Sequence, residues 1–199
     1  MIHQDSIFLA DKPLDKTSFD IVALFKREFQ LKKIGHSGTL DPKATGLLIL
    51  CSGKKTKLIN EFIDYDKEYN GIIRIGATTP TFDTESEEEN LTETESVTDE
   101  MIEKIKEKFT GDIEQIPPMH SAVKHKGKPL YKMARKGETI ERKPRQITIS
   151  ELYLKRISDT EIFFNVSCSK GTYIRTLAND IGAELGVGGY LKTLQRTRI

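Results

Sequence analysis

Strand-like and helix-like patterns of apolar residues alternate along the whole chain, without the regular strand–helix rhythm of a parallel sheet. Residues 161–168 alternate apolar and polar side chains as a strand does, whereas residues 172–185 repeat apolar side chains at helical spacing. We expect strands at 47–51, 68–76, 146–157, 161–168 and 190–196, and helices at 18–29, 54–64, 98–109, 130–136 and 172–185. This irregular order predicts an α+β fold with a mixed, largely antiparallel sheet and flanking helices.

The composition is typical of one globular domain: 199 residues, of which 37% are hydrophobic and 31% charged. The longest apolar runs have five residues, whereas a membrane span needs about 20. Because the first residues also lack the features of a signal peptide, we expect a cytoplasmic protein without a membrane partner. Cys51 and Cys168 follow apolar runs and are expected to be buried thiols, and the four histidines show no metal-ligand spacing.

A formal net charge of +1 conceals an asymmetry. The window 83–103 carries ten acidic residues and no basic one, whereas 124–145 carries nine Lys or Arg against two Glu. The basic stretch can bind a polyanion or can simply be a solvated loop. We expect residues 77–97 to form an exposed, mobile insertion, and we assign no chemistry to the acidic window.

The segment 35–46, GHSGTLDPKATG, is the main candidate for chemistry, and its composition predicts a loop after a helix capped by Ser18. It carries one carboxylate, Asp41, before a proline that biases its backbone toward extended conformations. The chain has neither a complete P-loop motif nor the G-x-S-x-G motif of hydrolases. The residues alone leave open whether Asp41 is catalytic or belongs to an ordinary Asp-Pro turn.

The sequence GHSGTLDPKATGLLIL at 35–50 resembles the catalytic motif of the TruB family of tRNA pseudouridine synthases. Further segments resemble family motifs in the same order: KPLDKTS at 12–18, DKEY at 66–69, FDT at 82–84, IPPMHSAVK at 116–124, LY at 130–131, CSKGTYIR at 168–175 and LQRT at 194–197. The resemblance therefore extends over most of the chain and implies a pseudouridine-synthase-like fold with a thumb insertion.

The resemblance also implies a domain organisation. We expect residues 1–199 to form a single catalytic domain, with 77–110 as the acidic thumb or insertion region. Relatives commonly continue into a small C-terminal RNA-binding domain, which we expect to be absent from this chain.

The resemblance implies a role for each matched residue. Asp41 would be the catalytic aspartate, and Arg175 would pair with it and hold it ionised. Tyr69 would pack on the target uracil, while Tyr173 and Leu194 would line the pocket for the base.

The remaining matched residues would contact the RNA outside the pocket. His36 would lie against the RNA loop and help to hold the displaced nucleotide outside its stack. The RNA backbone would be contacted by basic residues of the 124–145 stretch: Lys124, Lys126, Lys128, Lys132, Arg135 and Arg142.

The implied activity is the isomerisation of a uridine to pseudouridine at position 55, in the T loop of tRNA, with no metal, no cofactor and no obligate protein partner. The carboxylate could attack the sugar C1′ or the base, or remove a sugar proton, and the sequence does not choose. Three alternatives remain: a guide-RNA-dependent relative, a chaperone that folds tRNA without chemistry, and a generic hydrolase, for which no nucleophile–base pair is visible.

Overall fold

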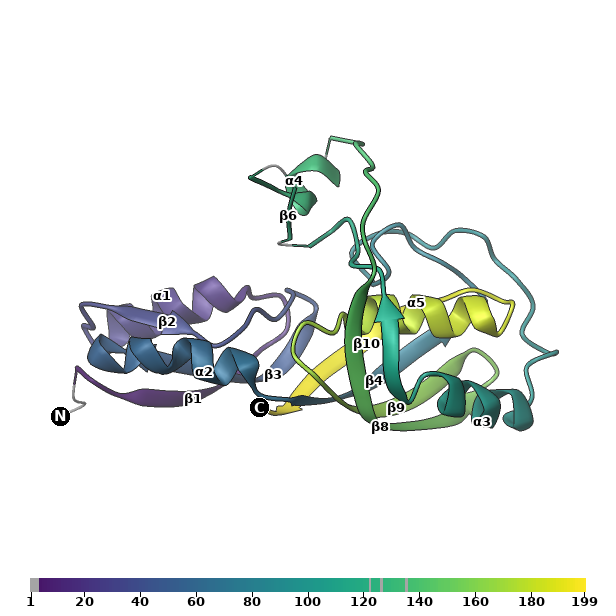
Figure 1. Ribbon diagram of the computed structural model, residues 1–199, viewed down its shortest axis with the longest axis horizontal. Helices are drawn as coiled ribbons and strands as arrows, with labels where there is room; N and C mark the ends of the chain where they lie inside the picture. The colour runs from purple at the N-terminus through teal and green to yellow at the C-terminus, as the bar shows by residue number, and fades with distance from the viewer. Residues whose placement is uncertain (1–3, 122, 126, 135) are drawn as a thin grey trace. The chain divides into compact units, whose positions relative to one another are not determined.

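The computed structural model describes residues 4–121, 123–125, 127–134 and 136–199. The chain divides into two compact units (Figure 1). Unit 1 runs to Asn70 and includes Thr193–Ile199, and unit 2 is Gly71–Lys192. Two strands contribute residues to both units: β4 (Lys67–Ile75) and β10 (Gly189–Arg198).

Unit 1 is built around a central strand, β3. This strand runs over Ala44–Ser52, and the elements around it are β1 (Ile7–Lys12), α1 (Ser18–Glu28), β2 (Ile34–His36), the 3-10 helix η1 (Gly53–Leu58) and α2 (Ile59–Asp64). Strands β1 and β2 pair with β3 in antiparallel fashion, and β10 pairs with it in parallel. The core of the unit consists of Ala10, Ile21, Val22, Leu48 and Leu50, with Phe8, Phe25 and Ile34 packed against them.

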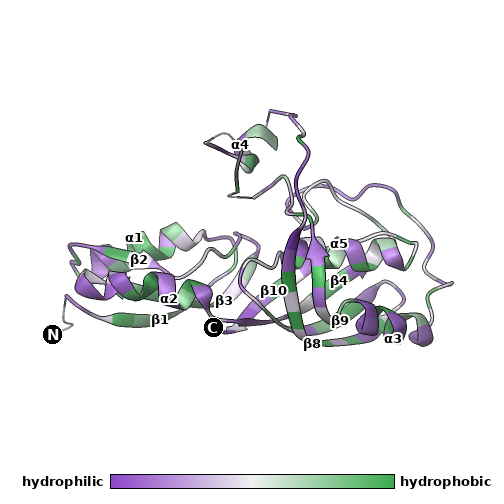
Figure 2. Ribbon diagram, in the orientation of Figure 1, coloured by the Kyte–Doolittle hydropathy of each residue, from purple (hydrophilic) through white to green (hydrophobic). Residues whose placement is uncertain are grey.

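Unit 2 combines an antiparallel sheet with helices. Its elements are α3 (Asp99–Lys108), β5 (Gly111–Gln115), β6 (Lys124–His125), β7 (Lys128–Pro129), α4 (Leu130–Ala134), β8 (Arg145–Ser158), β9 (Glu161–Cys168) and α5 (Ile174–Glu184). Strand β8 lies between β5 and β9 and pairs with both in antiparallel fashion. Hydrophobic and hydrophilic bands alternate along β8 and β9 (Figure 2), because one face of each strand is buried.

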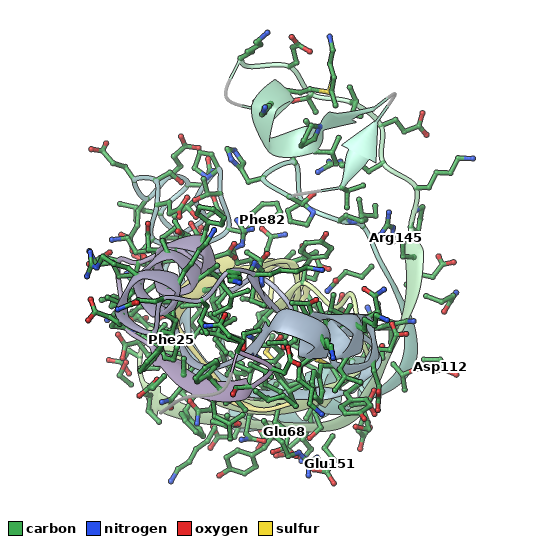
Figure 3. All side chains as sticks on the ribbon, turned by 90° about the vertical axis from the view of Figure 1, so that its left-hand side faces the viewer. Phe25, Glu68, Phe82, Asp112, Arg145 and Glu151 are labelled. Carbon is green, nitrogen blue, oxygen red and sulfur yellow. The ribbon has the colours of Figure 1, made fainter. Side chains whose placement is uncertain are left out.

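A short segment with β6, β7 and α4 stands away from the sheet of unit 2 (Figure 1). Arg145, the first residue of β8, marks its base (Figure 3). This segment carries most of the basic stretch that the sequence singles out.

The predicted fold class, a mixed and largely antiparallel α+β fold, is confirmed, and so are the buried positions of Cys51 and Cys168. Two local predictions are wrong. The loop at 35–46 is shorter than expected, because β2 continues to His36 and β3 begins at Ala44. The cap of α1 is Thr17 and not Ser18, because the Thr17 side chain accepts a hydrogen bond from the Asp20 N–H in a reciprocal capping box.

The acidic insertion is tied to unit 2, contrary to the prediction that 77–97 is exposed throughout. Ala77 and Val97 are buried. The Thr94 hydroxyl donates to the Asp159 carbonyl at 2.7 Å, and the Tyr190 hydroxyl donates to the Glu88 carboxylate at 2.8 Å. The high charge of this segment suggested that it is unstructured, but both a threonine and an acidic side chain of it bond to the rest of unit 2. Within the described residues, no helix has the length and hydropathy needed to cross a membrane.

Candidate active site

Asp41 lies in a tight loop, residues 37–43, that joins β2 to β3 in unit 1. Asp41 is partly buried, and its backbone carbonyl accepts a hydrogen bond from the Ala44 N–H at 3.0 Å. On its N-terminal side, the buried Ser18 hydroxyl accepts from the Leu40 N–H at 2.8 Å and donates to the Leu40 carbonyl at 3.2 Å. The first residue of α1 therefore holds the backbone directly before Asp41.

The backbone directly after Asp41 is held by a buried cation. The Lys12 side chain is fully buried, and its ammonium donates to the carbonyls of Pro13 at 2.9 Å, Lys16 at 2.6 Å and Pro42 at 3.4 Å. Burial lowers the pKa of Lys12, and the nearby Asp41 carboxylate opposes this shift. The Asp41 carboxylate therefore lies near enough to the buried ammonium to act on its charge.

Arg196 supports the same loop from β10. The residue is 2% exposed, and its guanidinium donates to the carbonyls of Leu47 at 2.8 Å and Gly38 at 3.3 Å. Gly46 allows the backbone of Arg196 to lie close to β3. It has φ +99°, and a Cβ atom there would lie 2.3 Å from the backbone carbonyl oxygen of Arg196. Arg196 belongs to the LQRT motif at 194–197, which predicted no role for its side chain.

His36 and Leu194 flank the loop in unit 1. Half-buried His36 ends β2, and its Nδ1 accepts a hydrogen bond from the Gly38 N–H at 3.3 Å. Burial lowers the pKa of His36, and the charge of Arg196 acts in the same direction. Leu194 pairs with Ala44 at the start of β3. Both predicted site residues therefore come from strands that border the Asp41 loop.

Tyr69 lies on β4, two residues after a second buried lysine. The Lys67 ammonium donates to the carbonyls of Phe62, Ile63 and Tyr65 at 3.3, 2.6 and 2.5 Å. A cation at this position complements the negative end of α2. Lys67 thereby fixes the start of the strand that carries Tyr69.

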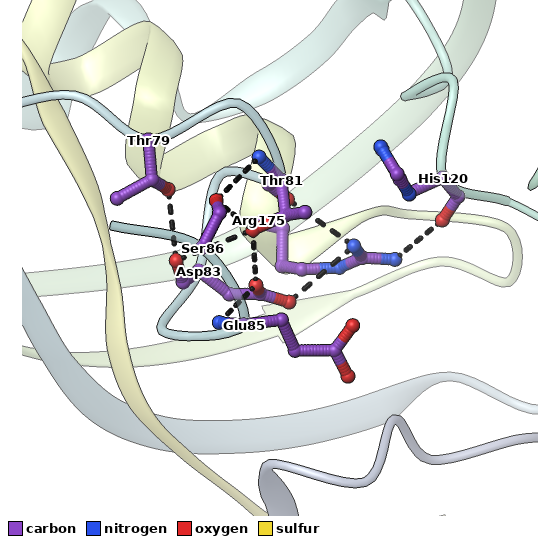
Figure 4. A network of polar contacts seen from close by, with 7 residues as sticks. All are labelled: Thr79, Thr81, Asp83, Glu85, Ser86, His120 and Arg175. Carbon is purple, nitrogen blue, oxygen red and sulfur yellow. Dashed lines mark hydrogen bonds and ion pairs between the residues drawn. The ribbon is translucent and has the colours of Figure 1, made fainter. Parts of the chain in front are cut away.

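In unit 2, Arg175 is the centre of a buried polar network (Figure 4). Its guanidinium lies 3.4 Å from the Asp83 carboxylate and donates to the carbonyls of Thr81 at 3.2 Å and His120 at 2.7 Å. The Asp83 carboxylate also accepts from the Thr81 hydroxyl at 2.6 Å and from the Glu85 N–H at 3.0 Å. The arginine is therefore held by two segments that are distant from it in sequence.

This network builds part of the acidic window into the interior of unit 2. Asp83 is 2% exposed and forms an ion pair with Arg175, a contact that the sequence pattern did not predict. Asp83 lies in the FDT segment, which resembles a family motif. That the acidic window carries no chemistry stays a prediction. The pairing of Arg175 with Asp41 stays a prediction, because the two residues belong to different units.

Buried polar atoms without a hydrogen-bond partner gather in the motif segments. Among the described residues, four of the five such side-chain atoms are Ser37 Oγ, Asp83 Oδ2, Ser121 Oγ and Thr176 Oγ1. Ser37 lies in the Asp41 loop, and the other three belong to the Arg175 network or follow one of its residues in the chain. Unsatisfied buried polar atoms are uncommon in folded proteins, and one of these four, Asp83 Oδ2, lies 3.4 Å from the Arg175 guanidinium in the ion pair described above.

The basic segment presents some of its predicted RNA contacts to solvent. Lys128 and Lys132 are exposed on β7 and α4, and Lys124 lies in β6. Arg142 differs, because it is partly buried and donates to the Pro117 carbonyl at 3.3 Å. Two further predicted contacts lie outside the described residues: Lys126 and Arg135.

Comparison with known proteins agrees with the motif resemblance. The family model described as TruB family pseudouridylate synthase (N terminal domain) matches residues 26–174. A tRNA pseudouridine synthase B of Chlorobaculum tepidum is 50% identical over 196 residues, which cover 96% of this chain and 82% of the relative. The corresponding protein of Parabacteroides distasonis is 48% identical and is covered to 85%.

Solved structures show the same fold. A chain in the crystal structure of a Cbf5-Nop10-Gar1 complex superposes with a TM-score of 0.76 at 30% identity, covering 98% of this chain and 49% of the other. A chain from an H/ACA RNP bound to a substrate RNA gives a TM-score of 0.71 at 27% identity, covering 98% of this chain and 47% of the other. With the motifs, the site and the relatives in agreement, the chain belongs to the TruB family of pseudouridylate synthases.

Proposed function

We propose that this chain converts uridine to pseudouridine at position 55 in the T loop of tRNA, without a cofactor and with Asp41 as the catalytic carboxylate. The observation that carries the proposal is the way Asp41 is held. Ser18 fixes the residue before it and Lys12 the residue after it, so the carboxylate stands on a rigid, electrostatically favourable backbone. Relatives named tRNA pseudouridine synthase B, up to 50% identical, support tRNA as the substrate.

The chemistry needs no electrons and no transferred group from outside. The N1–C1′ bond breaks, the uracil rotates, and a C5–C1′ bond forms. The hydrogen at C5 leaves to solvent, and N1 gains a proton. A single carboxylate that forms a transient bond or moves a proton is sufficient for this exchange. Arg175, through the proposed pair with Asp41, would keep that carboxylate ionised.

The base must leave the stack before it reacts, which costs a few kcal/mol. Aromatic side chains offset this cost because they stack on a displaced base, which is the role we assign to Tyr69 and Tyr173. Leu194 would add apolar contact to the base, and His36 would hold the opened RNA loop. The exposed Lys128 and Lys132 would bind phosphates of the stem.

The release of tritium from uracil C5 tests the proposal. A T stem-loop RNA labelled at C5 is incubated with the chain, and the freed tritium is counted. The unmodified chain should release close to one tritium per RNA. Asp41→Asn should bind the RNA with unchanged affinity and release tritium at least about 10³-fold more slowly, because the general acid–base or nucleophilic group is gone.

Asp112→Asn is the matched control. Asp112 is an exposed carboxylate on β5 that accepts a hydrogen bond from the Thr148 hydroxyl at 2.6 Å, and its removal should leave tritium release unchanged. If Asp41→Asn released tritium as fast as the chain without the substitution, Asp41 would not be the catalytic carboxylate. Restored folding of the RNA without any release by the unmodified chain would favour a chaperone.

A second candidate, guide-RNA-dependent modification, is favoured by the likeness to the chain of the Cbf5-Nop10-Gar1 complex. Its identity of 30% is lower than the 45–50% of the relatives named tRNA pseudouridine synthase B. The two candidates differ in one requirement. Tritium release that depends on an added guide RNA and its proteins would favour the second candidate.

A further inference from the structure

Gln115 makes an unusual pair of contacts in unit 2. It is the last residue of β5 and is 3% exposed. Its amide nitrogen donates to the Tyr173 carbonyl at 3.0 Å, and its amide oxygen accepts from the Tyr173 N–H at 2.7 Å. One side chain thus satisfies both backbone groups of a residue 58 positions away in sequence.

Tyr173 needs this support because it begins a helix. It is the N-cap of α5, with extended backbone at φ −97° and ψ 105°, and its side chain makes no capping hydrogen bond. The direction in which the chain enters α5 is therefore set from outside the helix. Gln115 supplies the side-chain contacts that fix the backbone at this position.

The same short segment also holds Arg175. Five residues after Gln115, the His120 carbonyl accepts a hydrogen bond from the Arg175 guanidinium at 2.7 Å. Segment 115–120 therefore contacts the backbone of Tyr173 at one end and the side chain of Arg175 at the other. A shift of Gln115 would move both residues relative to Asp83.

We propose that Gln115 is a positioning residue for the uridine isomerisation. Through its amide it fixes the backbone of Tyr173 and the first turn of α5, so that the Tyr173 ring and the Arg175 guanidinium meet the target base in one arrangement. This inference rests on the proposed function, since both residues act on the substrate only if that function is correct.

Glutamine is the side chain that these contacts require. It offers one donor and one acceptor in a plane at the length that the two bonds need. Glutamate has no donor when ionised and directs a second oxygen at the Tyr173 carbonyl. Methionine matches the length but makes neither bond.

The test compares Gln115→Met and Gln115→Glu with the unmodified chain on the labelled T stem-loop RNA. Both variants should bind the RNA within about twofold of the unmodified affinity, because most binding contacts go to phosphates elsewhere. Their single-turnover rate of tritium release should fall by about 10- to 100-fold, as expected for a misplaced pocket. The matched controls are Gln146→Met and Gln146→Glu, because Gln146 lies exposed on the paired strand β8, where its side-chain amide donates to the Glu114 carboxylate. Both should react at the unmodified rate.

A double-mutant cycle separates positioning from general destabilisation. Since Tyr173→Ala leaves the backbone bonds to Gln115 in place, the variant removes only the ring. If Gln115 acts largely through that ring, adding Gln115→Met to Tyr173→Ala should slow release by less than about threefold. An equal slowing in both backgrounds would contradict the inference that Gln115 acts through the Tyr173 ring.

Two results would overturn the inference: an unmodified release rate in both Gln115 variants, or loss of cooperative thermal unfolding in both. The proposed function fails in a different way, by the absence of tritium release from the unmodified chain itself.

Discussion

Buried polar side chains that bond to backbone groups surround the residues assigned to the substrate. Lys12 and Ser18 hold the backbone on either side of Asp41, and Gln115 holds that of Tyr173. Each hydrogen bond adds only about 1 kcal/mol of net stability, but leaving one of these buried groups unpaired costs about 1–3 kcal/mol. Such contacts therefore determine geometry more than they determine stability.

Gly46→Ala should destabilise unit 1 strongly. The new Cβ would meet the Arg196 carbonyl oxygen at 2.3 Å and would occupy a backbone with φ +99°. Gly171→Ala is the control, because φ is +81° there and nothing lies within 4 Å. The free energy of unfolding in urea should fall by roughly 1–2 kcal/mol for the control, from backbone strain alone, and by at least about 3 kcal/mol for Gly46→Ala. Equal decreases would contradict the packing role of Gly46.

His36 should remain neutral to lower pH than a free histidine. Burial and the Arg196 charge lower its pKa below the usual 6.5, and a protonated Nδ1 could not accept the Gly38 N–H. The unfolded chain then binds more protons than the folded chain, so this contribution to stability is complete above pH 6.5 and disappears as the pH falls. Titration of the imidazole resonances by NMR checks the pKa. His36→Gln should lose less stability than the unmodified chain on acidification.

At the scale of elements, local signals predicted local structure well. Helix α3 (Asp99–Lys108) lies within the predicted 98–109, and β9 occupies the predicted residues 161–168. The predictions of local structure fail where a residue distant in sequence determines the conformation. Ala44–Gly46 looked like loop because the residues are small, but they pair with β10, about 150 positions later in sequence. Two mutually bonded residues, Asp83 and Arg175, are likewise 92 positions apart, and no periodicity reveals such a contact.

The candidate site shows the same contrast between local signals and contacts distant in sequence. Their identities came from motif resemblance, whereas the side chains that hold them came only from the structure. Arg196 and Gln115 are a charged and a polar residue in strands, positions that usually face solvent. Their burial depends on backbone carbonyls and amides that the sequence does not show.

Thr17→Ala should destabilise α1. The Thr17 hydroxyl accepts from the Asp20 N–H at 3.0 Å, and the Thr17 N–H donates to the Asp20 carboxylate at 2.8 Å. Removal of such a cap typically costs about 1 kcal/mol. Urea unfolding measures the change, and Thr84→Ala, at an exposed position of the insertion, should stay within about 0.5 kcal/mol of the unmodified chain. No difference between the two variants would contradict the capping box.

Over the whole molecule, charge is separated along the chain. The acidic window 83–103 is bonded to the rest of unit 2 by Asp83, Glu88 and Thr94, while much of the basic stretch 124–145 lies in the segment that stands away from the sheet. A net charge of +1 is therefore no guide to the local field. A polyanion would be attracted to the basic segment and repelled by the acidic window.

Removing Lys128 and Lys132 together, by substitution with alanine, should weaken binding of the T stem-loop RNA. The slope of log affinity against log salt should become shallower by about 0.7–0.9 for each phosphate that the variant no longer neutralises. Filter binding between 50 and 200 mM salt, about the range in which such effects are large, measures both quantities. Lys106→Ala with Lys108→Ala is the control, because both lysines pair with glutamates near α3. An unchanged slope in the first variant would exclude a phosphate-binding role for both lysines.

Arg196 and Leu194 reach the Asp41 loop only through the last residues of the chain. During translation, residue 41 emerges from the ribosome long before codon 196 is read. At 5–20 residues per second the delay is roughly 8–30 s. Throughout that interval the nascent polypeptide contains its aspartate but lacks the arginine that braces it. Under the proposed function, a growing chain should therefore release no tritium from the RNA until its synthesis has passed β10.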